Sequence, residues 1–134
     1  MKIDGGCYCG YITYEGDADP ETATICHCTD CQQLSGSAFR TAIPVNSSTF
    51  RIVSGEPTIY VKTAESGNRR QQAFCPRCGS PIFSTAPGDG PKNYMIRLGT
   101  VRQRDHFEPK LQIWSRSRQR WLDNLASTRA LDKE

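Results

Sequence analysis

Seven cysteines in three short clusters constrain this chain more than any other feature of its sequence. The clusters read C-Y-C at residues 7–9, C-H-C-T-D-C at residues 26–31 and C-P-R-C at residues 75–78. Disulfides belong to oxidising compartments, and an odd number of cysteines argues against a complete disulfide framework. We therefore interpret these side chains as metal ligands or redox thiols before disulfides.

Counting ligands divides the seven cysteines into a group of four and a group of three. A structural zinc takes four tetrahedral ligands, whereas a working zinc site keeps one position open. The first and third clusters supply two ligands each, so they are expected to form one closed zinc site from Cys7, Cys9, Cys75 and Cys78. The middle cluster is then expected to hold a second, catalytic zinc through Cys26, Cys28 and Cys31. The fourth ligand of that second site is expected to come from outside the chain.

Three thiolates on Zn²⁺ leave a net charge near −1, which makes the ion a poor Lewis acid for generating hydroxide. Zinc still favours a further sulfur ligand. A small thiol bound there would have a lowered pKa and a nucleophilic sulfur. The pattern therefore favours thiol chemistry over water chemistry.

Other interpretations of the cysteines stay open at this stage. Cys75 and Cys78 have the spacing of a thioredoxin-like redox pair, although the βαβ setting of that motif is missing. A single zinc with the remaining cysteines buried, or with Cys26 and Cys31 as reactive thiols, is a further alternative. His27 lies between two expected ligands and is left out of the ligand set.

The length of 134 residues predicts one domain, and hydrophobic periodicity predicts a mostly β fold. Short β-branched and aromatic runs alternate with Gly, Pro and Ser. These predicted strands cover residues 8–15, 22–26, 37–45, 49–53, 58–63, 71–74, 82–84, 94–98 and 111–114. Short helical turns are predicted at 28–34 and 118–126.

The charge and hydropathy of the chain limit the classes of partner that it is expected to bind. Seven thiolates and two Zn²⁺ ions would together cancel the formal net charge of +3, so overall basicity does not argue for nucleic acid. Residues 97–121 nevertheless carry seven Lys or Arg against two acids, a cluster that could attract an anion or form a solvated surface. No apolar run is long enough to span a bilayer, and the first six residues lack the apolar segment of a signal peptide, so a cytoplasmic protein is expected.

With these residues described, the chain resembles the glutathione-dependent formaldehyde-activating family, also called the GFA or centromere-protein-V domain family. The resemblance runs from about residue 3 to about residue 122, which implies a domain core over these residues and a C-terminal tail at about 123–134. Its carrying motifs are G-C-Y-C-G at 6–10 with Tyr14 following, C-H-C-T-D-C at 26–31, S-G-S-A-F at 35–39 and F-C-P-R-C-G-S-P-I-F at 74–83.

The resemblance implies a β-rich, tent-like fold shared with zinc-binding Rab exchange factors and B-type methionine-sulfoxide reductases. It also implies a structural zinc on Cys7, Cys9, Cys75 and Cys78 and a catalytic zinc on Cys26, Cys28 and Cys31, as ligand counting does. The implied activity is that of a carbon–sulfur lyase, which joins formaldehyde to glutathione as S-hydroxymethylglutathione.

The cysteine pattern says less about which residues contact the substrate than about which residues bind the metal. Glutathione carries two carboxylates, so Arg40, Arg77 and the arginines of residues 97–121 are candidate partners. The S-G-S sequence at 35–37 could present hydroxyls to an anion or form a plain turn, and Trp114, Trp121 and Phe107 are expected in the core or a cleft wall. The alternative function is a non-catalytic, zinc-stabilised interaction module whose partner binds the basic late segment.

Overall fold

Ten strands in two sheets make up most of the ordered secondary structure of the chain. The computed structural model describes residues 1–134, and the expectation of a mostly β fold is confirmed. The strands are β1 (Lys2–Gly6), β2 (Thr13–Asp17), β3 (Thr24–Cys26), β4 (Arg40–Asn46), β5 (Arg51–Ser54), β6 (Thr58–Thr63), β7 (Arg69–Phe74), β8 (Pro81–Thr85), β9 (Asn93–Arg97) and β10 (Leu111–Ile113). The α-helix is α1 (Thr29–Ser35), and short 3₁₀ helices cover Pro20–Thr22, Leu98–Thr100, Arg104–His106, Ser115–Ser117 and Arg120–Ser127.

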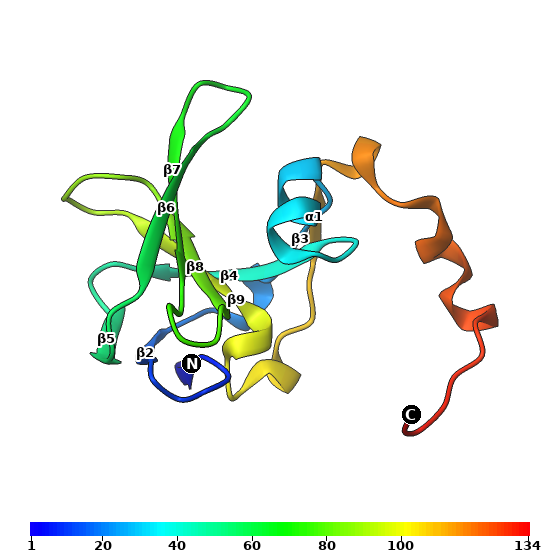
Figure 1. Ribbon diagram of the computed structural model, residues 1–134, viewed down its shortest axis with the longest axis horizontal. Coiled ribbons are helices and arrows are strands. Elements are labelled where there is room, and N and C mark those ends of the chain that lie inside the picture. Colours follow the sequence, from blue (N-terminus) through cyan, green and yellow to red (C-terminus); the bar gives the residue numbers. More distant parts are fainter.

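The smaller sheet has the order β1-β2-β5, and the larger has the order β10-β3-β4-β9-β8-β7-β6. All neighbouring strands are antiparallel except β10 and β3, which run parallel. The hairpin of β6 and β7 projects from the body of the molecule, and α1 lies beside β3 (Figure 1). This hairpin and α1 border the site described below.

The core lies between the two sheets. Ile3 and Tyr14 of the small sheet pack in one buried cluster with Ile43, Val45 and Ile96 of the large sheet. A Cβ at Gly16 would lie 2.8 Å from Val45 Cγ1, so the absence of a side chain on β2 allows the two sheets to approach closely. At one end of the core the rings of Phe50 and Tyr94 stack with centroids 4.4 Å apart.

Two differences from the sequence prediction concern the N-terminal strands. A single strand was expected at 8–15, but residues 7–12 form a cysteine-bearing turn between β1 and β2. The sequence of β1, K-I-D-G-G, contains one large apolar residue and two glycines, so its propensity for strand is low. Pairing with β2 along its whole length makes it a strand nonetheless.

The chain leaves the sheets after β10. The last residues, from orange to red in Figure 1, run away from the body of the molecule. The helical turn expected at 118–126 is present as the 3₁₀ helix Arg120–Ser127. None of the helices combines the length and apolarity needed to cross a membrane.

A candidate metal centre and its cavity

The structure gathers the cysteines into two clusters, in the grouping that the sequence predicts. In each cluster the sulfur atoms all lie within 4.8 Å of one another. One cluster contains Cys7, Cys9, Cys75 and Cys78, and the other contains Cys26, Cys28 and Cys31. The donor sets are therefore four thiols and three thiols.

The four-thiol cluster is built from two turns that present their amides to sulfur. The Ile12 amide donates to Cys7 Sγ at 3.2 Å, and the Arg77 amide donates to Cys75 Sγ at 3.4 Å. The Tyr8 amide donates to Ser80 Oγ at 3.0 Å, which ties the two turns together. Amides aimed at sulfur stabilise thiolates, so this donor set fits a closed structural zinc site.

The hydroxyl of Ser80 also contacts a thiol of this cluster. It lies 3.2 Å from Cys78 Sγ, and mainly for this reason the pKa of Cys78 falls to about 5. A thiol of low pKa is already ionised at neutral pH, which is the form that a metal requires.

The three-thiol cluster results from a strand that ends directly before a helix. Cys26 is the last residue of β3, Cys28 is the N-cap of α1, and Cys31 lies in the first turn of that helix. The Cys31 amide donates to Cys28 Sγ at 3.2 Å. The helix ends at Gly36, whose φ of 66° is in the left-handed region that favours glycine.

No fourth protein ligand joins these three sulfurs. His27 points elsewhere: its ring is buried, and Nε2 lies 2.7 Å from Gln112 Oε1. The carboxylate of Asp30 is 2.7 Å from Lys62 Nζ. Three thiols with no further histidine or carboxylate fit a soft cation such as Zn²⁺ that keeps one position for another ligand.

Two of the three thiols, those of Cys26 and Cys31, shift each other's pKa in opposite directions. The Cys31 thiol lowers the pKa of Cys26 by donating to it, and the same interaction, with burial, raises the pKa of Cys31. One sulfur of the cluster therefore ionises more easily than its neighbour, as expected of thiols close enough to bind one ion.

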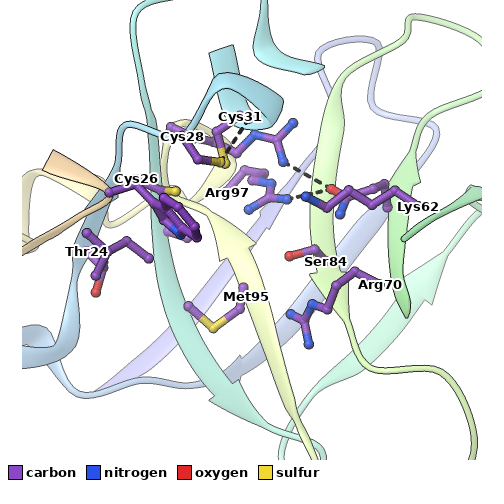
Figure 2. Close-up of a pocket in the computed structure, with 14 residues that line it drawn as sticks. Thr24, Cys26, Cys28, Cys31, Lys62, Arg70, Ser84, Met95 and Arg97 are labelled. Atoms are coloured by element: carbon purple, nitrogen blue, oxygen red, sulfur yellow. Dashed lines mark hydrogen bonds between the residues drawn. The ribbon is translucent and has the colours of Figure 1, made fainter. Parts of the chain in front are cut away.

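A cavity of about 250 Å³ opens beside the three sulfurs (Figure 2). This volume lies just below the usual range for small-molecule sites, about 300–1,000 Å³. Apart from the three cysteines, its lining consists of Thr24, Arg40, Ala42, Lys62, Arg70, Gln72, Ser84, Met95, Arg97, Ile113 and Trp114.

The register of the seven-stranded sheet explains why distant residues meet here. Side chains directly opposite each other on paired strands share a face of the sheet. Cys26 pairs with Arg40, Ala42 pairs with Arg97, and Lys62 pairs with Arg70. One face of the large sheet therefore forms the floor of the cavity, and its other face packs in the core.

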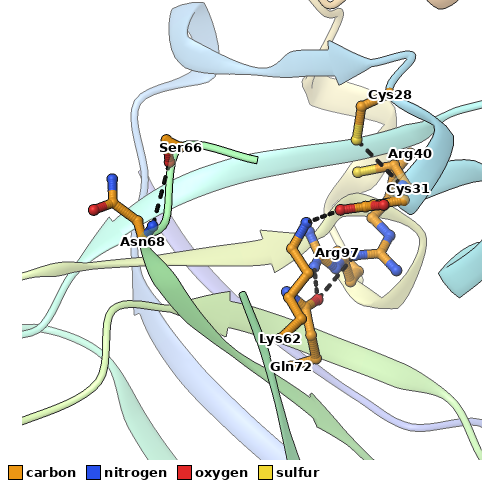
Figure 3. Close-up of polar contacts among 9 residues, drawn as sticks. Cys28, Cys31, Arg40, Lys62, Ser66, Asn68, Gln72 and Arg97 are labelled. Atoms are coloured by element: carbon orange, nitrogen blue, oxygen red, sulfur yellow. Dashed lines mark hydrogen bonds and ion pairs between the residues drawn. The ribbon is translucent and has the colours of Figure 1, made fainter. Parts of the chain in front are cut away.

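Cations dominate the polar lining of the cavity. Arg40 Nη1 and Arg97 Nη2 both donate to Gln72 Oε1, each at 3.0 Å (Figure 3). Arg70 and Lys62 also line the cavity, and no Asp or Glu does. The Lys62–Asp30 ion pair links β6 to α1 at the edge of the site.

Among the candidate substrate arginines, Arg40 and Arg97 line the cavity and Arg77 does not. The guanidinium of Arg77 instead lies 3.9 Å from the ring centroid of Tyr11. The late basic segment does not form one unpaired patch: Arg102 pairs with Asp4 and Arg118 pairs with Asp123.

Of the other residues that the sequence analysis singled out, some line the cavity and others do not. Ser35, Gly36 and Ser37 form the turn that ends α1 and are not part of the cavity lining. Trp114 lines the cavity and Phe107 is buried in the core, as expected. Trp121 is 53% exposed, so its expected place in the core or cleft wall is wrong.

Sequence reasoning missed eight lining residues: Thr24, Ala42, Lys62, Arg70, Gln72, Ser84, Met95 and Ile113. Arg70 and Gln72 were a detectable signal, because they are polar, two residues apart and therefore on one face of a single strand. Such a polar face on an internal strand indicates either solvent or a site. The cross-strand partners of this face cannot be read from spacing alone.

Two comparisons with known proteins gave matches that cover most of the chain. The sequence profile of the family described as "Glutathione-dependent formaldehyde-activating enzyme" matches residues 2–117. The crystal structure of a Rhodobacter sphaeroides protein is similar, with a TM-score of 0.61 and 21% sequence identity over 84% of this chain and 99% of that chain. At this identity the structural similarity speaks for the fold alone.

Proposed function

The chain belongs to the glutathione-dependent formaldehyde-activating enzyme family, and from this premise we propose that it joins a thiol to a small carbonyl compound. The proposed substrates are glutathione and formaldehyde, and the proposed product is S-(hydroxymethyl)glutathione, which makes the protein a carbon–sulfur lyase. The single observation that carries the proposal is a cluster of three thiols, with no fourth protein ligand, beside a cationic cavity.

Two zinc ions are part of the proposal. Cys7, Cys9, Cys75 and Cys78 would hold a structural ion, and Cys26, Cys28 and Cys31 would hold a catalytic one. A zinc ion on three thiolates supplies a binding position that lowers the pKa of an incoming thiol. The proposal also implies a reducing compartment such as the cytoplasm, where the seven cysteines remain thiols.

The reaction requires no oxidant or reductant. The sulfur of the thiol attacks the carbonyl carbon and a C–S bond forms, while the π pair of the C=O bond moves to oxygen. The thiol loses its proton and the oxygen gains one, so atoms and electrons balance. The hydroxyl of Ser84 and the ammonium of Lys62 are donors in the cavity lining for that oxygen.

The protein contributes position and charge. A cavity of about 250 Å³ receives the sulfur-bearing part of a peptide thiol and leaves the rest of the peptide outside. Arg40, Arg70 and Arg97 create a positive potential that attracts an anionic thiol and favours its ionised sulfur. Holding the sulfur at a fixed position turns an encounter between two solutes into reaction at one prepared site.

The direct test follows adduct formation from glutathione and formaldehyde with zinc-loaded protein. We expect the initial rate to exceed the spontaneous rate in proportion to protein concentration. Arg51→Gln is the matched control, because Arg51 is exposed and pairs with Glu15 on the small sheet, away from the cavity. No gain over the spontaneous rate with fully zinc-loaded protein would reject this pair of substrates.

A further inference from the structure

Two arginine side chains beside the three-thiol cluster lack acidic partners. Arg40 is 8% exposed, and neither its guanidinium nor that of Arg97 forms an ion pair in the structure. Their side-chain hydrogen bonds converge on one neutral acceptor, Gln72 Oε1. The buried Nε atoms of both arginines have no hydrogen-bond partner at all.

Such an arrangement is costly in the absence of an anion. A buried cation without a counter-ion loses hydration that a single amide oxygen does not replace. Burial and the nearby charge of Arg40 lower the pKa of Arg97 to about 9, which leaves it charged at neutral pH. Burial also lowers the pKa of Arg70, the third cation of the cavity without an acidic partner.

The net charge of the site indicates the charge that a bound substrate must carry. Lys62 is neutralised by Asp30, so Arg40, Arg70 and Arg97 contribute three positive charges to the cavity. Zinc on three thiolates contributes a net charge of about −1. Two negative charges are needed for balance, and an ionised thiol supplies one of them. The second fits a carboxylate on the same molecule.

We propose that Arg40 and Arg97, aided by Arg70, bind a carboxylate of the thiol substrate inside the cavity. This assignment rests on the proposed function and deepens it, because it makes the substrate a thiol acid. Two guanidinium groups fixed on one glutamine side chain present several N–H donors, which is the pattern that holds a carboxylate by more than one hydrogen bond.

The assignment also gives the orientation of glutathione. Its γ-glutamyl carboxylate carries an adjacent ammonium, which three arginines would repel, whereas its glycine carboxylate does not. The volume of about 250 Å³ suits the cysteinyl-glycine portion better than the whole tripeptide. The glycine end therefore enters with the sulfur, and the γ-glutamyl end stays outside.

The test is calorimetric binding of glutathione and its glycine monoethyl ester to the zinc-loaded protein. The ester keeps the thiol and the γ-glutamyl group and removes one negative charge. We expect the wild type to bind the acid about 10- to 100-fold more tightly, since hydrogen bonds to a charged group are strong. Arg97→Gln should bind the acid less tightly and reduce the preference to less than about 3-fold. The control Arg51→Gln should keep the full preference.

Arg97→Lys keeps the charge but not the planar fork, so its preference should fall between those of the wild type and Arg97→Gln. It also provides the measurement if Arg97→Gln does not fold. Equal binding of acid and ester by the wild type, no binding of either, or a full preference in the Arg97 variants would overturn the assignment.

Binding and catalysis fail separately in this design. A preference that depends on Arg97 without faster adduct formation leaves the carboxylate site standing and rejects formaldehyde as the second substrate. Faster adduct formation with equal binding of acid and ester supports the enzyme and rejects the carboxylate site.

Discussion

Replacing Cys28 by serine separates the two roles that the structure gives this residue. Cys28 Sγ is one of the three clustered thiols, and it is also the N-cap that accepts from the Cys31 amide at 3.2 Å. A serine hydroxyl is a good N-cap but a poor replacement for a thiolate ligand. Cys28→Ser should therefore lose the second metal and keep the N-cap of α1, whereas Cys28→Ala should lose both the metal and the cap.

The magnitude follows from the cap. Losing an N-cap side chain costs about 1 kcal/mol, which corresponds to about 4 °C in Tm for a domain of this size. We expect Cys28→Ser to unfold about 4 °C above Cys28→Ala when both are free of excess zinc. We also expect zinc content to fall from two ions per chain to one, and adduct formation to fall to the spontaneous rate.

Metal analysis, thermal unfolding and the rate assay are measured on the same preparations. Two zinc ions and undiminished activity in Cys28→Ser would refute the assignment of Cys28 as a catalytic ligand. A Tm drop far larger than the cap explains, with no activity in the wild type, would instead favour the interaction module with a purely structural second zinc. One zinc ion per chain in the wild type would favour reactive thiols, and no metal, at the three-thiol cluster.

Three further predictions concern the other cluster, the core and the cavity. Cys75→Ser removes a fully buried thiol from the four-thiol cluster, the proposed structural zinc site, so it should lower Tm far more than Cys28→Ser does. Equal Tm values would contradict a structural role of this cluster. Burial raises the pKa of Tyr14 to about 12, so the phenol keeps its proton in the folded state at a pH where the unfolded state loses it. The free energy of unfolding should therefore fall between about pH 10 and pH 12. Ultraviolet titration should show one tyrosine that ionises late, and Tyr14→Phe should remove it. Lys62→Met breaks a partly exposed ion pair with Asp30, so the free energy of unfolding should fall by at most about 1 kcal/mol. The carboxylate of Asp30 is then uncompensated beside the cavity, so calorimetry should show weaker binding of glutathione. Tighter binding would contradict the charge count.

The predicted metal ligands were accessible from sequence because the cysteines occur in three groups that are each local in the chain. Cys26, Cys28 and Cys31 lie within six residues, and the two ligand pairs of the other cluster are each within four residues. Chain stereochemistry then limits how far apart such sulfurs can lie. Only the joining of Cys7 and Cys9 to Cys75 and Cys78 required a long-range inference, and ligand number supplied it.

The alternation of apolar and polar residues predicted the N-terminal strands less well. Alternating residues marked most of the large sheet, but β1 has low propensity and exists because β2 pairs with it. Trp121 was misplaced for a related reason. An aromatic residue usually indicates a core, yet the chain leaves the sheets before it reaches this position.

The sequence by itself determined the donor sets of the two thiol clusters, because the spacing of thiols along a few residues decides which sulfurs can share one ion. Only the tertiary structure decided which cations face those thiols. Arg40, Arg70 and Arg97 come from three strands, and Arg77 is equally arginine but faces Tyr11. Sheet register brings the first three to one face, and register is set by pairing between distant segments that no local pattern contains.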